Sequence, residues 1–407
     1  MFPLFLALKY LKPKRTFTTV VTLISILGVI LGVAIVIIVR AVMTGFGDMW
    51  EEKILDFKPH IVVNSWHGTI PDEETVCLKL EAIPGVLAVS PGIEMRVMLQ
   101  CGRRLAAPLM EGTDAARATR MMPRIRPYSG SFNLDGENAV IGIDLAMELG
   151  ATVGDKILVY SPASYVNKDE FAFPTELTVA GIYNSGQRDF DLGYVFVSLP
   201  TARDLMGMRS GAYSVHAKVA RPQAIEAFDQ ILLKVHEALG SDYRVRTWKE
   251  IDRMLFSTLA VEKNMMAILL MFITIVAIFC VTNTLIVVTV QKTHEIGLLK
   301  ALGFSARQIR LTFVLHGWIQ CIIGTGLGIA VAFIVLHNLQ ALVEALAKVG
   351  ITVFPKEVYG LAQLPWRVVP LEVIQVAASV VVFCAMASFI PAWVASRKDA
   401  AEALRKE

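Results

Sequence analysis

The chain is 407 residues long, which exceeds the roughly 100–200 residues of a typical single domain. Hydrophobic residues make up 55% of it and charged residues only 18%, where soluble domains average about 45–50% and about 25%. This composition argues against a disordered chain, a collagen-like repeat and a protein with a nucleic-acid partner. It favours a protein with long apolar segments.

Four segments contain no Asp, Glu, Lys or Arg. They lie at 16–39, 264–291, 311–343 and 373–396 and hold 24, 28, 33 and 24 residues. At about 1.5 Å per helical residue, each can cross a hydrocarbon core of about 30 Å. The sequence therefore predicts an integral membrane protein with four transmembrane helices, at 16–42, 264–291, 311–343 and 373–396.

Charge is distributed unevenly between the two sides of these helices. Residues 44–263 hold 23 Lys and Arg against 29 Asp and Glu, whereas the rest of the chain holds 16 against 7. Basic residues crowd 1–15, 292–310 and 397–407. Because cytoplasmic loops near membrane ends are enriched in Lys and Arg, we expect both termini and the 292–310 loop in the cytoplasm. The segments expected on the other side are 43–263 and 344–372.

The exported segment contains β-α-β patterns in its first and last thirds. The expected strands lie at 60–64, between Gly85 and Leu99, at 214–219 and at 243–247, and the expected helices run from Pro71 to about Gly85 and over 222–239. Two such patterns in one domain predict a split, ferredoxin-like α+β unit.

An insertion at about 114–211 separates the two patterns and is expected to be rich in β structure. Its strand candidates are 157–160, 177–183 and 194–198. Residues 161–176 form a long exposed hairpin or loop between two of these strands. Connections of that length are usually functional or disordered, so a functional hairpin and a tolerated surface loop both stay open.

The sequence contains five cysteines. Cys280, Cys321 and Cys384 lie in predicted spans, where cysteine acts as a small packing residue. Cys77 and Cys101 lie in the exported domain and could form a disulfide, which their spacing alone cannot decide.

Apolar residues recur at spacings of three and four on both sides of the exported domain. They are Met43, Phe46, Trp50, Ile54 and Phe57 after the first span, and Trp248, Ile251, Leu255 and Leu259 before the second. Both patterns predict amphipathic helical stalks. The stalks either pack on each other or on the domain, or they shelter a route for lipid. On the second interpretation, the substrate cavity is formed by Met43, Phe46, Trp50, Met265, Met266 and Leu269.

The loop between the second and third spans is the most informative stretch. A short helix is expected to end at Gly303, which suits a left-handed residue after a helix. Ser305 and Gln308 have the spacing of a capping box for the next helix. Such a rigid helix with exposed Leu and charge suits docking into a soluble partner, although an ordinary connector would look the same.

Residues Glu295–Gly303, with the sequence EIGLLKALG, and Glu262–Met266, with the sequence EKNMM, are together specific to one family. The chain resembles the permeases of the macrolide-exporter and lipoprotein-releasing superfamily of ABC transporters. The closer match is to the lipoprotein-releasing (Lol) subunits. Further matching blocks are Ala7–Leu11, Met43–Phe46, Trp248–Phe256, Pro391–Trp393 and Glu402–Arg405.

This resemblance implies a permease of the bacterial inner (plasma) membrane with a large periplasmic domain. It implies a dimer with a second permease, identical or homologous, and two copies of an ABC ATPase. The complex would extract acylated lipoproteins from the outer leaflet of the inner membrane and pass them to a periplasmic carrier protein. ATP and Mg²⁺ would be bound by the ATPase, and this chain would hold no cofactor and catalyse no reaction.

The resemblance also assigns residues. ATPase coupling would involve Glu295, Ile296, Gly297, Leu299, Lys300, Leu302 and Gly303. Glu295 would pair with a basic residue in the ATPase groove, while Ile296, Leu299 and Leu302 would fill it. Candidates for a carrier-binding hairpin are Tyr165, Phe171, Phe173 and Pro174. Because residues 168–171 depart from the family's pattern, the subunit could recruit the carrier or could instead receive the lipoprotein.

Energetics favour an ATP-driven route. Burying a methylene in a bilayer is worth about 0.8 kcal/mol, so three acyl chains of about fifteen methylenes would lose roughly 36 kcal/mol in water. The sequence contains no Gly-x-x-x-x-Gly-Lys-Ser/Thr phosphate loop, which predicts a separate ATPase subunit. None of the four charge-free segments supplies an acid for proton coupling.

Other functions stay open. An exporter of peptides or small amphiphiles would share the same fold and loop. A cell-division-type permease would transmit a mechanical signal without transport, although relatives of that kind have smaller exported domains. We find no catalytic triad and no metal-binding motif, because Leu298 stands where a zinc-protease motif beginning at His294 would need its second histidine.

Overall fold

The computed structural model describes residues 17–123, 125–161, 174–291, 293–350 and 364–397. It divides into two compact units. The first comprises the described parts of 1–48, 258–353 and 363–407, and we call it the membrane unit. The second comprises 49–257 together with a short segment outside the described residues, and we call it the sheet unit.

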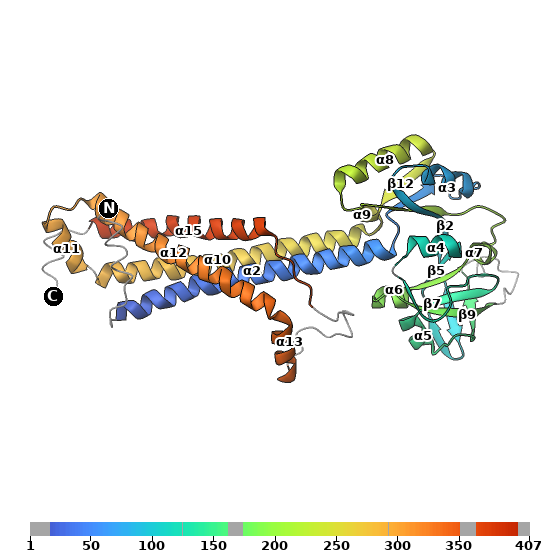
Figure 1. The fold of residues 1–407 in the computed structure, drawn as a ribbon, viewed down its shortest axis with the longest axis horizontal. Coiled ribbons are helices and arrows are strands. Elements are labelled where there is room, and N and C mark those ends of the chain that lie inside the picture. The colour runs from blue at the N-terminus through green and yellow to red at the C-terminus, as the bar shows by residue number, and fades with distance from the viewer. Residues whose placement is uncertain (1–16, 124, 162–173, 292, 351–363, 398–407) are drawn as a thin grey trace, which may run out of the picture. The chain divides into compact units, whose positions relative to one another are not determined.

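Within the described residues, four helices are long and apolar enough to cross a membrane. They are α2 (Phe17–Phe57), α10 (Arg253–Gln291), α12 (Ala306–His337) and α15 (Pro370–Arg397) (Figure 1). Both α2 and α10 continue without a break into the stretches where amphipathic stalks are predicted. At about 1.5 Å per residue, the 41 residues of α2 extend about 60 Å, twice the thickness of a hydrocarbon core.

Small residues let the membrane helices approach one another closely. A Cβ atom added to Gly324 or Gly328 of α12 would lie 2.8 or 2.9 Å from the Cβ of Val29 or Val33 on α2. A Cβ atom added to Gly32 would lie 2.9 Å from the Cβ of Ala277 on α10. Small residues at membrane helix interfaces act in this way.

The third predicted span differs from the helix observed. The charge-free segment extends to 343, but α12 ends at His337 and a separate amphipathic helix, α13 (Leu339–Lys348), follows. The break lies at Asn338, whose side-chain amide donates to the carbonyl of Ile334 at 2.8 Å. Asn competes with helical backbone hydrogen bonding in this way, and a composition-based boundary does not register it.

The sheet unit contains one mixed sheet of twelve strands. They are β1 (Ile61–Ser65), β2 (Val86–Arg96), β3 (Met98–Cys101), β4 (Arg104–Ala106), β5 (Leu109–Thr113), β6 (Arg126–Gly130), β7 (Asn138–Gly142), β8 (Lys156–Tyr160), β9 (Thr175–Asn184), β10 (Tyr194–Ser198), β11 (Ser214–Val219) and β12 (Tyr243–Thr247). The order is β12-β1-β11-β2-β5-β10-β7-β9-β8-β3-β4, with β6 paired to β9. Strand β2 pairs with β11 on one side and with β5 on the other, so it connects the two parts of the sheet.

The first part of the sheet is antiparallel, with the order β12-β1-β11-β2. Helices α3 (Glu73–Glu81) and α8 (Ile225–Leu239) contribute Leu80, Phe228 and Val235 to its core. The α3 helix begins at Glu73, two residues after the expected start at Pro71. Asp72 caps it by accepting a hydrogen bond from the amide of Thr75 at 3.3 Å.

The second part runs from β2 through β5 to β4 and includes two parallel pairs, β5–β10 and β7–β9. Four short helices accompany it: α4 (Ala115–Met121), α5 (Ile143–Leu149), α6 (Arg188–Gly193) and α7 (Leu199–Met206). The predicted β-rich insertion is therefore an α and β segment. These helices hold six to eight residues, and the roughly 11–18-residue window in which helical periodicity is recognisable exceeds that length.

The two cysteines of the exported segment do not form a disulfide. Cys77 is a free thiol buried beside Leu80, whereas Cys101 is a half-buried free thiol packed against the core of the second part. Burial raises the pKa of Cys77 to about 12. Because the thiolate is the reactive form, this thiol is an inert packing residue.

Candidate functional site

The loop after α10 contains the expected short helix, α11 (Thr293–Ala301). Gly303 follows with φ +90°, a left-handed conformation that glycine adopts without strain. Ser305 caps α12 as predicted, because its amide donates to Gln308 Oε1 at 2.9 Å and its hydroxyl accepts from the Gln308 amide at 3.4 Å. The connection is therefore a defined helix–turn–helix.

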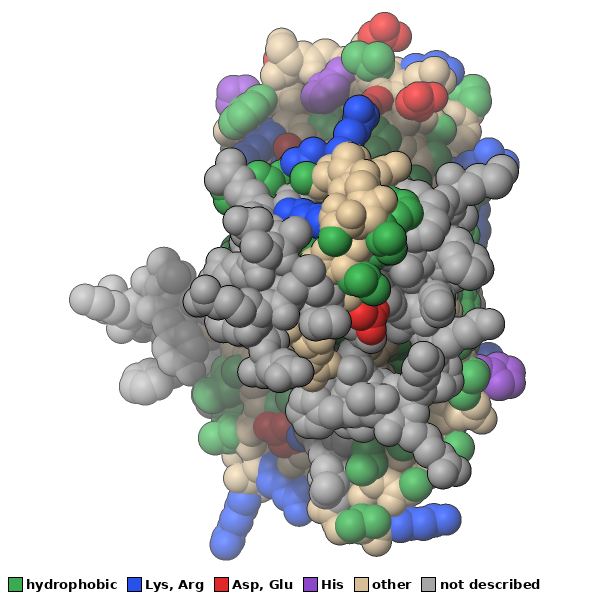
Figure 2. Space-filling model, turned by 90° about the vertical axis from the view of Figure 1, so that its left-hand side faces the viewer, with side chains coloured by type: hydrophobic (Ala, Val, Ile, Leu, Met, Phe, Trp, Pro, Cys, Tyr) green, Lys and Arg blue, Asp and Glu red, His purple; other side chains and the backbone are tan. Residues whose placement is uncertain are grey.

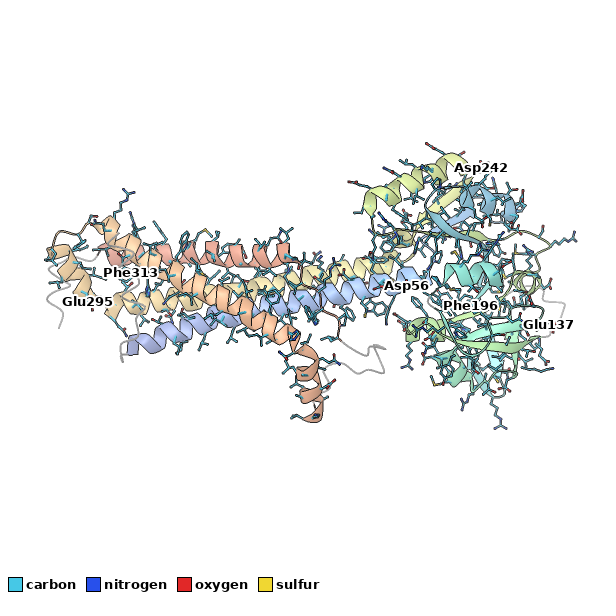
Figure 3. The ribbon with its side chains drawn as sticks, in the orientation of Figure 1. Asp56, Glu137, Phe196, Asp242, Glu295 and Phe313 are labelled. Atoms are coloured by element: carbon cyan, nitrogen blue, oxygen red, sulfur yellow. The ribbon has the colours of Figure 1, made fainter. Side chains whose placement is uncertain are left out.

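The coupling candidates divide between the two sides of α11. Ile296 is 1% exposed and packs against Val288, Ile309, Phe313 and Ala392 of the three neighbouring membrane helices. Figure 3 labels Phe313 of this cluster and Glu295, the residue before Ile296. Ile296 therefore cannot fill a groove on another protein as predicted, because this chain already buries it. Gly297 is also buried, and Leu299 and Lys300 are half-buried.

The outer side of α11 has a different composition from that predicted. Glu295 and Leu298 of α11 are exposed, and so are Leu302 and Gly303 in the turn that follows it. Leu298 was not among the predicted contacts, and it lies three residues after Glu295, on the same helical face. Figure 2 views this end of the chain, where hydrophobic side chains lie beside an acidic one on the surface that the grey atoms leave visible. The exposed surface of Glu295, Leu298 and Leu302, which we call the docking face, is suited to a soluble partner.

The six predicted cavity residues lie on α2 and α10. The two helices are antiparallel and touch at Gly32 and Ala277. Met43 lies eleven residues after Gly32, and Met266 lies eleven residues before Ala277, so both lie at one level along the helix pair. Met43, Phe46, Trp50 and Met266 are half-buried, whereas Met265 and Leu269 are 61% and 55% exposed. Five of them belong to the membrane unit, whereas Trp50 belongs to the sheet unit and packs against its cluster that includes Ile54 and Phe57.

The stalk before the second span is shorter than predicted. Trp248 is 2% exposed, in the core of the first part of the sheet, and belongs to a separate one-turn helix, α9 (Trp248–Ile251). A capping box between Thr247 and Glu250 starts that turn. The continuous helix begins only at Arg253. Trp248 therefore packs in the core of the sheet unit and is not part of the stalk.

The carrier-hairpin candidates Tyr165, Phe171 and Phe173 lie outside the described residues. Pro174 is described and half-buried, and it directly precedes β9. Proline at the first position of a strand needs no ladder hydrogen bond. Its position is therefore explained by the start of the strand.

Two buried side chains that the sequence reasoning missed hold the C-terminal end of α2. Lys218 of β11 donates from Nζ to the carbonyls of Leu55 and Asp56, the first at 2.8 Å. His60 Nε2 lies 2.9 Å from the same Leu55 carbonyl. A cation is favourable at a helix C-terminus. These contacts join strand β11 to the C-terminal end of α2.

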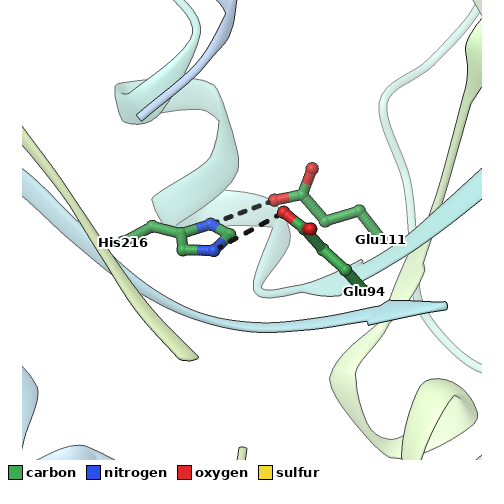
Figure 4. A group of neighbouring side chains, drawn as sticks. All are labelled: Glu94, Glu111 and His216. Carbon is green, nitrogen blue, oxygen red and sulfur yellow. Dashed lines mark ion pairs between the residues drawn. The ribbon is translucent and has the colours of Figure 1, made fainter. Parts of the chain in front are cut away.

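Sequence reasoning also missed a cluster of Glu94, Glu111 and His216 (Figure 4). Burial raises the pKa of Glu94, the imidazole of His216 partly offsets this, and the carboxylate of Glu111 raises the pKa further. For His216, burial lowers the pKa, but the two facing carboxylates outweigh burial and raise it. No local motif signals these residues, because they come from three separate strands.

Comparison with known families agrees with this arrangement. Residues 22–235, just over half of the chain, match the family described as MacB-like periplasmic core domain. Residues 267–400 match the FtsX-like permease C-terminal family. The chain belongs to the MacB-like, FtsX-like permease family. It is therefore a membrane protein of the ABC transporter permease type, with a MacB-like periplasmic domain.

Several relatives match over the whole length of the chain. The lipoprotein-releasing system transmembrane protein LolC of Xylella fastidiosa strain Temecula1 is 28% identical over 410 residues, covering 99% of this chain and 98% of the relative. LolC of Neisseria meningitidis serogroup B is 27% identical with the same coverage. LolE of Haemophilus influenzae is 24% identical over 99% of both chains. This permease is therefore homologous to LolC and LolE.

Two solved structures are similar over about half of the chain. The periplasmic region of MacB from Actinobacillus actinomycetemcomitans is 11% identical with a TM-score of 0.34, covering 49% of this chain and 93% of that one. The extracellular domain of YknZ from Gram-positive bacteria is 13% identical with a TM-score of 0.33, covering 47% and 100%.

Proposed function

We propose that this permease extracts acylated lipoproteins from the outer leaflet of the inner membrane and passes them to a periplasmic carrier. The observation that carries this proposal is the end-to-end match to LolC relatives, at 27–28% identity over 99% of this chain. A match that includes both the periplasmic domain and the membrane helices supports a shared transport task.

The permease family implies an ATPase partner and a paired permease. We propose two copies of the ATPase, which bind ATP and Mg²⁺, and a second permease that is either identical or of the LolC/LolE type. The docking face supports this, because Glu295 can pair with a basic residue while Leu298 and Leu302 fill an apolar groove. Ile296 takes a different role from that first expected, because it links α11 to α10, α12 and α15.

The proposed topology places both termini and residues 292–310 in the cytoplasm, and 43–263 and 344–372 in the periplasm. The excess of basic residues outside the large exported segment supports this orientation. The antiparallel β12-β1-β11-β2 order with α3 and α8 supports a ferredoxin-like first part of the periplasmic domain.

We further propose that acyl chains leave the bilayer along the apolar surfaces of α2 and α10. Met265 and Leu269 are exposed in the single chain, so a second permease would be needed to enclose this surface. An enclosed apolar route offsets the cost of roughly 0.8 kcal/mol for each methylene that would otherwise enter water. Movement of α11, transmitted through Ile296 and α10, would open and close it.

A photocrosslinking experiment tests the substrate route. A photoreactive residue at Phe46 or Met266, in the assembled transporter in membranes, should capture an acylated lipoprotein. The matched control carries it at Leu233, an exposed position of α8. A lipoprotein whose acylated cysteine is replaced by serine should not be captured. Capture of the paired permease alone would show that these residues only pack between subunits, and the proposal would fail.

A further inference from the structure

Three side chains with metal-binding atoms converge in the sheet unit on adjacent strands (Figure 4). Glu94 of β2 lies directly opposite Glu111 of β5, and His216 comes from β11 on the other side of β2. Like charges directly opposite each other on neighbouring strands are destabilising. A positive group between the two carboxylates would therefore stabilise this part of the sheet.

The distance between His216 and Glu111 suits a shared metal ion better than a direct hydrogen bond. His216 Nδ1 lies 3.4 Å from Glu111 Oε1. Hydrogen bonds from nitrogen to oxygen are about 2.7–3.2 Å long. Two ligands on one tetrahedral zinc ion, each about 2.1 Å from it, lie about 3.4 Å apart. One ligand atom from each of the three residues lies within 4.8 Å of the others.

The surroundings of His216 orient one nitrogen toward Glu111. His216 Nε2 is 2.9 Å from Ser214 Oγ, and that hydroxyl donates to the carbonyl of Gly92 at 3.2 Å. These two hydrogen bonds place the imidazole proton on Nε2, which leaves the lone pair of Nδ1 facing Glu111. Metal-binding histidines usually donate their other N–H to an outer partner in this way. The imidazole is only 3% exposed, so its orientation is fixed by packing.

A cavity above the cluster has room for the remaining ligands. It measures about 260 Å³ and is lined by all three residues together with Ser90, Asn64, Lys58 and Arg246. The two cations have other partners, because Lys58 pairs with Asp252 at 2.6 Å and Arg246 donates to Asn64 Oδ1 at 2.9 Å. The side chain of Glu94 is 45% exposed, so its carboxylate can rotate without disturbing the core.

We propose that Glu94, Glu111 and His216 bind a divalent transition-metal ion, for which Zn²⁺ fits the ligand set, with water completing the coordination. One imidazole nitrogen and two carboxylates are ligands that Zn²⁺ accepts. The ion would join β11, β2 and β5, where the two parts of the sheet meet. Its role would be structural, because it lies on the strands that connect them.

Cobalt binding to the full-length permease in detergent tests this site. After chelator treatment, Co²⁺ should bind at one equivalent per chain with visible d–d absorption, and Zn²⁺ should abolish that absorption. E94Q and H216Q should weaken binding by at least about tenfold, and S214A, which removes the outer partner, by about tenfold. E137Q, at a glutamate in the same unit but outside the cluster, is the matched control.

The E94Q variant tests the site even if H216Q does not fold. The Glu94 side chain is half-exposed, so its replacement should leave the fold intact. Zn²⁺ should also raise the thermal midpoint of the native permease, and raise that of E94Q by less at the same Zn²⁺ concentration. Absence of Co²⁺ absorption in the native chain, or equal Co²⁺ affinity in E94Q, would overturn the proposal. His216 would then serve only as the positive group between two carboxylates.

Discussion

His60 is a buried histidine whose two hydrogen bonds require the neutral form. Its Nε2–H donates to the Leu55 carbonyl at 2.9 Å, and its Nδ1 accepts from the Val219 amide at 3.0 Å. Protonation of Nδ1 would break the second bond. Burial lowers the pKa of His60 to about 4; the Leu55 carbonyl opposes this shift and the Lys218 ammonium adds to it.

The sign of the pH effect follows from this lowered pKa. The unfolded histidine has a pKa of about 6.5, so between pH 6.5 and about 4 the unfolded state binds more protons. The stability contributed by neutral His60 is fully present above pH 6.5 and is lost as the pH falls toward 4. A difference of about 2.5 pKa units corresponds to roughly 3 kcal/mol.

Hydrogen exchange at the Val219 amide measures this effect in the full-length permease. After correction for intrinsic rates, we expect more frequent opening at pH 5 than at pH 7, because protonated His60 no longer accepts that amide hydrogen. The H60Q variant lacks the titrating group, so its corrected exchange should be nearly independent of pH. An equal pH dependence in both proteins would assign the effect to another residue.

At the scale of the element, the existence and ends of α11 depend on local sequence, whereas the side of the helix that is buried depends on tertiary packing. The helix, the turn at Gly303 and the Ser305–Gln308 capping box were predicted correctly, since each depends on residues close in the sequence. The inward direction of Ile296 depends on α12 and α15. No local pattern could therefore distinguish Ile296 from Leu298.

The docking face predicts which substitutions disconnect the ATPase. E295Q combined with L298A removes a charge and an apolar side chain that are both exposed, so the permease should fold normally. If Glu295 and Leu298 carry the binding energy of the interface, their loss costs more than about 1 kcal/mol each, and about 1.4 kcal/mol is a tenfold change in affinity. We expect co-purification with the ATPase to weaken by at least about tenfold.

The matched control for this experiment is E344Q combined with L342A on α13, which changes an exposed acid and an exposed leucine elsewhere in the membrane unit. I296V is a second control, because removing one methylene from a buried site costs only about 0.5–1.5 kcal/mol. Both controls should retain the ATPase. Undiminished association of the docking-face variant would remove α11 from the interface.

The strands and long helices were largely predictable, whereas the sites were only partly so. Alternating residues at 214–219 and the amphipathic pattern at 222–239 correspond to β11 and α8. Helices such as α6, with six residues, are too short for periodicity to reveal. The cluster of Glu94, Glu111 and His216 depends on the pairing of β11, β2 and β5. Pairing between strands distant in the sequence leaves no local signal.

At the scale of the whole molecule, the membrane helices differ in how much of their apolar surface this chain covers. In the most apolar 18-residue stretch of α2, 44% is buried within this chain, whereas in that of α10 only 18% is buried. Large apolar side chains such as Met265, Phe272 and Phe279 therefore face outward from α10. That surface is suited to lipid or to the paired permease, and it includes the proposed route for acyl chains.

The proposed function requires the docking face and the sheet unit to lie on opposite sides of the membrane. The charge asymmetry predicts a cytoplasmic α11 and a periplasmic sheet unit, because short loops rich in Lys and Arg near membrane ends remain in the cytoplasm. We expect a cysteine at Ser241, an exposed turn residue before β12, to react with a membrane-impermeant maleimide in intact spheroplasts. A cysteine at Ala306, exposed at the start of α12, should react only after permeabilisation.

Both substitutions would be made in a chain whose five native cysteines are replaced by alanine, so that each label reports one position. Ser241 and Ala306 are small residues, and neither replacement removes a charge that sets the topology. Labelling of Ala306→Cys in intact spheroplasts, with Ser241→Cys protected, would reverse the orientation. The docking face would then lie on the side without ATP, and neither ATPase coupling nor release of lipoproteins to the periplasm could operate through this chain.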